Sequence, residues 1–195
     1  MSGPLAPAGD GHTELTDDDR RGLIPTYITT RGELADAEQR GIARALLRRR
    51  PSIEQLLDDR YLRELHRAMF GDVWRWAGKY RRTDTNIGID HHRIPVAVRD
   101  LVDDARVQVE LATFPVDELA TRFHHRLVAI HPFPNGNGRH GRVAADLLLG
   151  ALDQPAFTWG SRLAVETAEL RAAYRRALER ADGGDVAELL AFVRS

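Results

Sequence analysis

Residues 131–142, HPFPNGNGRHGR, separate two stretches whose apolar residues recur at helical spacing. Pro132 disfavours helical geometry at the residue before it, so we expect the His131 imidazole where the first helix ends. Gly136 and Gly138 can adopt positive φ and bring bare backbone close to a ligand. The segment therefore predicts a helix–loop–helix unit whose loop carries chemistry.

The helix that begins around Gly138 offers a site for an anion. The N–H groups of its first turn have no partner within the helix, and its N-terminal end carries partial positive charge. Arg139 and Arg142 lie three residues apart, so both guanidinium groups can project from one face and suit a di- or triphosphate. His131, with an ordinary pKa of about 6.5, is expected to accept a proton beside the phosphate.

The rest of the chain predicts a mostly helical fold with one β-hairpin. Hydrophobic spacing, interrupted by Pro and Gly, indicates helices over residues 33–49, 61–70, 117–130, 167–180 and 185–193, a helix from Val96 that ends before Pro115, and one that begins around Gly138. Between Gly71 and Pro95, short β-prone pieces predict a hairpin with strands Tyr80–Asp84 and Ile87–Ile94.

Composition indicates one globular domain. The chain has 195 residues, 43% of them hydrophobic, with 28 Lys and Arg against 29 Asp and Glu. We expect a flexible tail over residues 1–22, where Gly, Pro and Asp predominate without an apolar face, and a single domain over residues 23–195. The net charge of −1 argues against a general polyanion binder, so no direct nucleic-acid partner is expected.

Two absences in the sequence exclude further classes. There is no cysteine, which excludes disulfides, thiolate nucleophiles and sulfur-ligated zinc. No stretch approaches the roughly 20 apolar residues that span a bilayer, and the N-terminus carries no signal-peptide pattern. We therefore expect a cytoplasmic protein with no membrane partner.

The motif follows the pattern H-x-F-x-[D/E]-G-N-G-R-x-x-R at all but one of its fixed positions. The matching residues are His131, Phe133, Gly136, Asn137, Gly138, Arg139 and Arg142. With this pattern the chain resembles the Fic (filamentation induced by cAMP) family; residues 73–89, VWRWAGKYRRTDTNIGI, are similar to the family's flap region, and the chain from about Ile24 resembles the Fic subgroup called mobile mystery protein B. The resemblance implies an all-α, Fic-type helical domain with one short β-hairpin flap.

The same resemblance implies an activity, the transfer of AMP from ATP to a Tyr, Ser or Thr hydroxyl of a target protein, with pyrophosphate as the leaving group. It makes His131 the general base and Phe133 the anchor of the loop. The phosphate ligands that it implies are Gly136, Asn137, Gly138, Arg139 and Arg142. In the family the flap holds the target by strand addition, and the residues to which this assigns target docking are Ile87, Gly88 and Ile89.

One position departs from the family pattern. Asn135 stands where the family has Asp or Glu for Mg²⁺, and its neutral carbonyl oxygen is a weaker ligand for a hard cation than a carboxylate. We therefore expect Mg²⁺ to be held mainly by the phosphates of ATP, with Asn135 as the protein-side ligand. Slower transfer, a different nucleotide and altered metal dependence all stay open.

Inhibition and a partner are also implied. Several Fic classes are silenced by a helix with the pattern [S/T]-x-x-x-E-[G/N], whose Glu pairs with the second motif arginine. Thr29 and Glu33 keep that spacing, although Leu34 replaces the small residue. Glu38 is the other candidate partner of Arg142, and ordinary solvated helix charges are the alternative. The subgroup resemblance further implies an antitoxin or a small DNA-binding protein as a partner.

Four other interpretations stay open. A kinase that moves the γ-phosphate, as in the related Doc proteins, is the second enzyme candidate, although intact Gly138 and Arg139 favour AMP transfer. A metal enzyme would draw on His91, His92, His124, His125 and His131, but no carboxylate lies at standard ligand spacing. A nucleic-acid-binding or interaction module would leave His131 unexplained. The fourth interpretation is a Gly- and Asn-rich turn with a helix cap, two surface arginines and a capped-off histidine.

Overall fold

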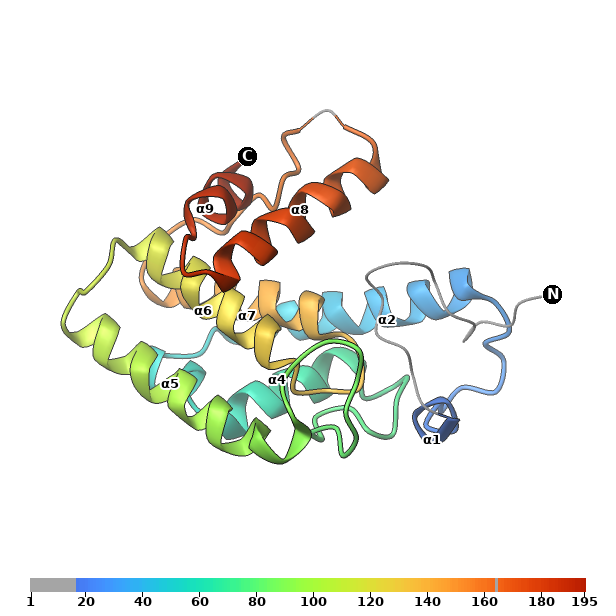
Figure 1. The fold of residues 1–195 in the computed structure, drawn as a ribbon. Coiled ribbons are helices and arrows are strands. Elements are labelled where there is room, and N and C mark those ends of the chain that lie inside the picture. The colour runs from blue at the N-terminus through green and yellow to red at the C-terminus, as the bar shows by residue number, and fades with distance from the viewer. Residues whose placement is uncertain (1–16, 164) are drawn as a thin grey trace.

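The computed structural model describes residues 17–163 and 165–195 and is built almost entirely of helices (Figure 1). Its elements are α1 (Asp17–Arg20), α2 (Arg31–Leu46), α3 (Ile53–Leu56), α4 (Asp59–Phe70), the 3-10 helix η1 (His91–Arg93), α5 (Ile94–Glu110), α6 (Val116–Ile130), α7 (Asn137–Ala151), α8 (Thr167–Asp182) and α9 (Ala187–Arg194). The prediction of an all-α fold is confirmed.

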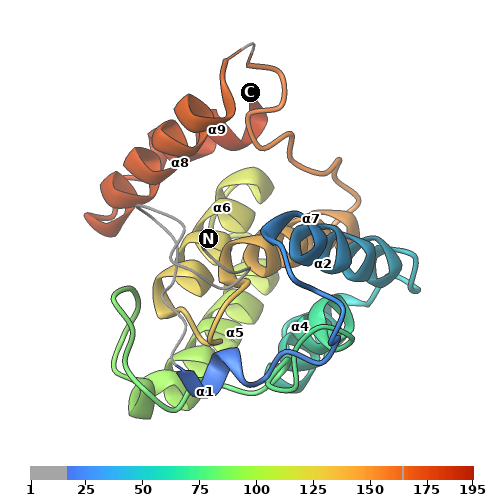
Figure 2. The same ribbon diagram turned by 90° about the vertical axis from the view of Figure 1, so that its right-hand side faces the viewer.

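The helix pair α6 and α7 forms the centre of the molecule, and the other helices surround it (Figures 1 and 2). α5 packs on α6, α3 and α4 pack on α7, and α2 packs on α4. The pair α8 and α9 covers another side of α6. Because residues 131–136 join α6 to α7, the motif loop lies where several helices can reach it.

A single apolar core connects these helices. Its largest fully buried side chains are Trp74, Phe70, Phe133, Leu56, Leu57, Leu62, Met69, Ile94, Leu101, Leu127, Leu148 and Leu149. Each buried leucine or phenylalanine contributes roughly 2 kcal/mol of hydrophobic stabilisation. At Gly41 of α2, a Cβ would lie 2.1 Å from the Met69 carbonyl oxygen, so only glycine lets α2 approach the end of α4 this closely.

Capping residues explain where the N-terminal helices begin. The Thr30 hydroxyl accepts a hydrogen bond from the Glu33 N–H at 3.2 Å, and the Glu33 carboxylate accepts one from the Thr30 N–H at 2.9 Å. This capping box starts α2 two residues before the predicted position. Ser52 and Gln55 form a second capping box, which nucleates the short helix α3 that the sequence pattern did not indicate.

The predicted β-hairpin is wrong: neither Tyr80–Asp84 nor Ile87–Ile94 forms a strand. Residues 80–90, which we call the flap, form an irregular loop before η1 (Figure 1). The reason is that its backbone bonds to the motif loop rather than to itself. The Arg81 N–H donates to the Pro132 carbonyl at 2.9 Å and the Ile89 N–H to the Ile130 carbonyl at 3.5 Å.

Most of the tail predicted over residues 1–22 lies outside the described residues, as does residue 164 of the predicted domain. The end of that tail is described. Asp17–Arg20 form α1, and the Asp19 carbonyl accepts a hydrogen bond from the Trp76 indole at 3.0 Å. Over the described part of the chain, no helix combines the length and apolar character that crossing a membrane requires.

Three fully buried histidines bridge the central helices. Nε2 of His66 donates to the Asn135 carbonyl at 3.0 Å while its Nδ1 accepts the Gly78 N–H at 3.0 Å. Nε2 of His140 donates to the Leu62 carbonyl, and that of His124 bonds to the Tyr174 hydroxyl, both at 2.9 Å. Burial lowers the pKa of His66 well below its ordinary value, that of His140 to about 4 and that of His124 to about 3.

We predict that acid destabilises the fold well above the titration range of most carboxylates. Because the folded pKa values of these histidines lie below the unfolded value of about 6.5, the unfolded chain binds more protons as the pH falls below that value. Each such histidine lowers the free energy of unfolding by about 1.4 kcal/mol per pH unit until its folded pKa is reached. Urea denaturation between pH 7 and 5 measures this slope.

The His140→Gln variant tests the assignment, because the amide can keep the hydrogen bond to Leu62 without titrating. The pH dependence of its unfolding free energy should be shallower by about one proton than that of the wild type. Equal slopes in the wild type and His140→Gln would contradict the prediction.

Candidate functional site

The structure places His131 at the C-terminal end of α6. The residue adopts left-handed backbone geometry, with φ of 54°, and ends the helix before Pro132. It is 6% exposed. Burial, and secondly the positive charge of Arg81, lower the pKa of His131 to about 4. At neutral pH the imidazole is therefore uncharged.

The loop after His131 is closed by the side chain of Asn137. Oδ1 of Asn137 accepts the Phe133 N–H at 2.9 Å, and Nδ2 donates to the Phe133 carbonyl at 2.8 Å. The Phe133 ring is buried and stacks on the His66 ring at 3.8 Å between centroids. Gly136 has φ of 81°, and a Cβ there would lie 2.7 Å from the Phe70 ring. The Asn137 side chain is thus committed to the turn, and only its backbone faces the helix start.

The first turn of α7 is open. A Cβ built on Gly138 would meet nothing within 4 Å, and no side chain caps the helix. No side chain caps this 15-residue helix, so its first-turn N–H donors and partial positive charge face the space beside the partly exposed Gly138. This end of α7 can accept an anion.

The two motif arginines lie in different electrostatic surroundings. NH1 of Arg139 lies 2.7 Å from Oε2 of Glu38, and its guanidinium lies 4.9 Å from the centre of the Phe70 ring. Arg142 lies over the Tyr174 ring at 5.8 Å, and no carboxylate of the described residues lies within 4 Å of it. Glu38 therefore balances the charge of Arg139 at contact distance, whereas the carboxylate of Asp146 acts on Arg142 only from beyond 4 Å.

The candidate pairing of Glu33 or Glu38 with Arg142 is wrong in this structure. Glu33 caps α2 and is exposed, where the backbone N–H groups of Thr29 and Thr30 lower the pKa of its carboxyl. Glu38 lies on the buried face of α2, 7% exposed, and its Oε1 accepts the Trp74 indole N–H at 2.7 Å. From this face of α2, Glu38 pairs with Arg139.

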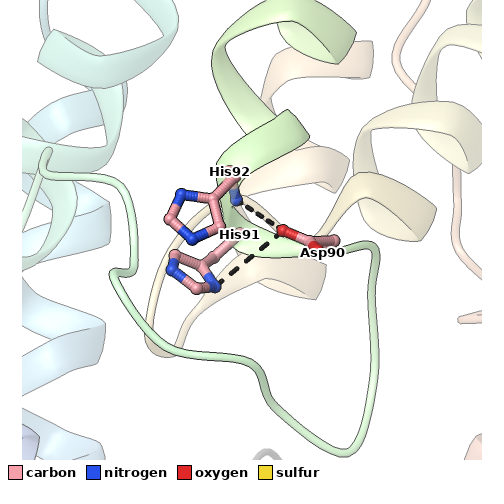
Figure 3. A group of neighbouring side chains, drawn as sticks. All are labelled: Asp90, His91 and His92. Carbon is pink, nitrogen blue, oxygen red and sulfur yellow. Dashed lines mark hydrogen bonds and ion pairs between the residues drawn. The ribbon is translucent and has the colours of Figure 1, made fainter.

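Asn135, the candidate metal ligand, is engaged in the turn itself. Its Oδ1 accepts the N–H of Gly136 at 2.6 Å, and its carbonyl accepts from His66. A neutral amide oxygen already used as an acceptor does not fit a protein-held Mg²⁺. In the described residues, metal-compatible donors gather elsewhere, at Asp90, His91 and His92 (Figure 3).

This group at the end of the flap has a local explanation. Oδ1 of Asp90 accepts the His92 N–H at 2.8 Å and so caps η1 (Figure 3). Oδ1 of Asp84 accepts a hydrogen bond from the His91 backbone N–H at 2.9 Å. The same oxygen lies 3.1 Å from Nδ1 of the His91 ring. These contacts close the flap at its base.

Of the histidines of the metal-enzyme interpretation, His91 and His92 lie together beside Asp90, and the other three do not belong to that group. His124 bonds to Tyr174, and His125 lies 2.8 Å from an Asp182 carboxylate oxygen. Neither belongs with His131 to any metal-compatible group among the residues that the structure describes. Among the described residues the interpretation therefore keeps only Asp90, His91 and His92, for which the capping contacts give a local explanation.

The flap lies directly against His131. At Gly88, with φ of 102°, a Cβ would lie 2.5 Å from the His131 Cβ and 3.1 Å from the Ile130 carbonyl oxygen. Ile87 is exposed and Ile89 half-buried. The three residues expected to dock a target are therefore adjacent to the residue expected to act as base.

Sequence reasoning missed Arg81, His66 and Tyr174. His66 carried a signal, because it lies among Leu62, Leu65 and Met69 on the apolar face of a predicted helix, where a polar side chain needs a partner. Arg81 carried none, since 28 Lys and Arg residues are spread along the chain. Its burial became visible only in three dimensions.

We predict that Gly88→Ala destabilises the protein by about 1–3 kcal/mol, because the new methyl group meets His131 and the left-handed φ strains alanine. Gly32→Ala is the matched control on α2, where the nearest atom lies 3.9 Å from the added Cβ. Urea denaturation measures both variants. Equal stability of Gly88→Ala and Gly32→Ala would contradict the close approach of flap and His131.

Comparison with known proteins finds similar sequences. Residues 56–149 match the model of the Fic/DOC family. Protein adenylyltransferase fic-1 of Caenorhabditis elegans is 30% identical over 135 residues, which make up 67% of this chain and 25% of that protein. The chain thus spans about a quarter of the length of this curated relative.

Solved structures share the fold. Fic-1 from C. elegans matches with a TM-score of 0.66 and 24% identity, over 89% of this chain and 51% of that one. BepC from Bartonella tribocorum, solved with bound AMPPNP, matches with a TM-score of 0.65 and 17% identity, over 92% of this chain and 97% of that one.

Proposed function

Since residues 56–149 of this chain belong to the Fic/DOC family, we propose that it is a protein adenylyltransferase that moves AMP from ATP to a hydroxyl side chain of a target protein. The observation that carries the proposal is that one short loop joins the uncharged, buried His131 to the open N-terminus of α7. A proton acceptor and an anion site at one loop are what transfer of a phosphate-linked group to a hydroxyl requires.

In the proposed reaction His131 takes the proton of the target hydroxyl. The hydroxyl oxygen forms a bond to the α-phosphorus of ATP, the bond between that phosphorus and the α,β-bridging oxygen breaks, and pyrophosphate leaves. Such transfer depends mainly on positioning and on stabilisation of negative charge. The first-turn N–H groups of Asn137, Gly138 and Arg139 would supply donors to the phosphates.

The two arginines would contribute unequally to nucleotide binding. Arg142, with no carboxylate of the described residues within 4 Å, would provide most of the charge, and Arg139 would offer the donors that Glu38 leaves free. The AMPPNP bound in BepC supports an adenine nucleotide as the ligand. Mg²⁺ would be bound through the phosphates of ATP, because Asn135 does not suit it.

The flap would hold the target. Ile87 is exposed and lies beside Gly88, which contacts His131, so a segment that bonds to this loop would present its hydroxyl near the imidazole. Backbone contacts would hold the target, and the side chains that meet Ile87 and Ile89 would select it.

Finer expectations about context belong to the same proposal. We place the reaction in a bacterial cytoplasm, as a toxin with an antitoxin or a small DNA-binding protein as partner. The support is the resemblance of the sequence from about Ile24 onward to the mobile mystery protein B subgroup, together with the cysteine-free composition.

Labelled ATP tests the reaction. Bacterial lysate incubated with the protein and ATP labelled at the α-phosphate should yield labelled protein, and ATP labelled at the γ-phosphate should not. His131→Ala should abolish the label, while His125→Ala, which removes a histidine paired with Asp182, should retain it. Label from the γ position alone would establish a kinase, and equal labelling by His131→Ala would reject both activities.

We further predict that Arg142→Gln weakens ATP binding by about 10- to 100-fold, the loss of one charge-assisted contact of about 1.5–3 kcal/mol. Arg99→Gln is the matched control, since Arg99 is exposed on α5. Isothermal titration calorimetry measures both. Unchanged affinity in Arg142→Gln would remove Arg142 from the nucleotide site.

A further inference from the structure

Arg81 is a buried cation at the start of the flap. The residue is 4% exposed, whereas its neighbour Arg82 is exposed. The nearest carboxylate is that of Asp84, 3.6 Å from NH1 and itself largely exposed. A guanidinium removed from water must bond its N–H donors within the protein, so the partners of Arg81 show what it holds.

Those partners are backbone carbonyls of three segments. Nε donates to the His131 carbonyl at 2.7 Å, and NH2 bonds to Ile130 at 3.5 Å. NH1 donates to Thr83 at 3.0 Å, and NH2 also donates to Ile89. One side chain therefore joins the end of α6 to both legs of the flap.

The contacts at α6 meet a specific need. The last carbonyls of a helix have no partner within it and carry partial negative charge, which a cation stabilises. His131 holds a left-handed conformation that costs a residue other than glycine about 1–2 kcal/mol. Bonds from Arg81 to the carbonyls of Ile130 and His131 fix the backbone at this strained position.

The flap is fixed by the same side chain. Its two legs do not pair with each other as strands, and Arg81 bonds to Thr83 on one leg and Ile89 on the other. Between them Gly88 lies against His131. Two backbone hydrogen bonds also link the flap to residues 130–132, but the guanidinium of Arg81 is the one side chain described here that bonds to both legs of the flap and to the His131 carbonyl.

We propose that Arg81 is a positioning residue for the transfer reaction: it holds His131 and the flap in one rigid frame, so that a hydroxyl docked on the flap meets the imidazole at a fixed distance. This inference rests on the proposed function. Arg81 has no assigned contact with the nucleotide, so its loss should impair transfer and leave ATP binding intact. A displacement of about 1 Å between reacting groups can cost about 100-fold in rate.

The test compares Arg81→Met, Arg81→Lys and the control Arg82→Met. With α-labelled ATP and a fixed concentration of bacterial lysate protein, the apparent kcat of Arg81→Met should fall by about 100-fold. Its Kd for ATP by calorimetry should stay within about twofold of wild type. Arg81→Lys keeps the charge and up to three donors and should recover part of the rate, and Arg82→Met should match the wild type.

A merely structural role gives a different pattern. If Arg81→Met and Arg81→Lys lose ATP binding and cooperative unfolding together with the rate, or if the apparent kcat falls by less than about threefold, the proposal is overturned.

Amide hydrogen exchange tests the role of Arg81 independently of the transfer activity. In Arg81→Met, amide exchange over residues 80–90 should rise by at least about tenfold while exchange over α7 stays unchanged. If the wild type labels no protein, the proposed function fails, yet exchange still decides whether Arg81 fixes the flap. If amide exchange over residues 80–90 is the same in Arg81→Met as in the wild type, Arg81 does not fix the flap and the proposal is refuted.

Discussion

The two hydrogen bonds between the Asn137 side chain and the Phe133 backbone are the interaction on which the site depends. They close the chain reversal between α6 and α7, and so determine where one helix ends and the next begins. His66 secures the reversal from α4 by stacking on Phe133 and donating to the Asn135 carbonyl. With the turn fixed from both sides, the N-terminus of α7 can remain uncapped without fraying into solvent.

The three arginines around this turn differ in how their positive charge is balanced. Arg81 is buried behind His131 and bonded to carbonyls, Arg139 is balanced by Glu38, and Arg142 has no carboxylate of the described residues within 4 Å. Only the last lacks a contact of this kind among the described residues, and the Asp146 carboxylate acts on it from beyond 4 Å. The neighbouring cation and the burial together keep His131 uncharged, so the base and the anion site do not compete for the same negative ligand.

The sequence predicted the helices and the motif loop because both are local. Pro132, Gly136 and the hydrophobic spacing of α6 and α7 act over a few residues, and the observed bounds differ little from the expected ones. The flap did not form the predicted hairpin because its hydrogen-bond partners are distant in the sequence. β-prone residues form a hairpin only when their backbones pair with each other, and here the backbone N–H groups of Arg81 and Ile89 donate to residues 130–132. Spacing alone likewise could not tell which motif arginine Glu38 would reach, since that depends on the packing of α2 against α4.

The ion pair between Glu38 and Arg139 has a consequence for where the functional unit ends. Glu38 lies outside residues 56–149, and so does Tyr174, the aromatic neighbour of Arg142. A fragment cut to the matched segment would keep the motif yet leave one arginine without its counter-charge and the other without its ring. The smallest piece of this chain that preserves the electrostatics of the loop must therefore extend from α2 through α8.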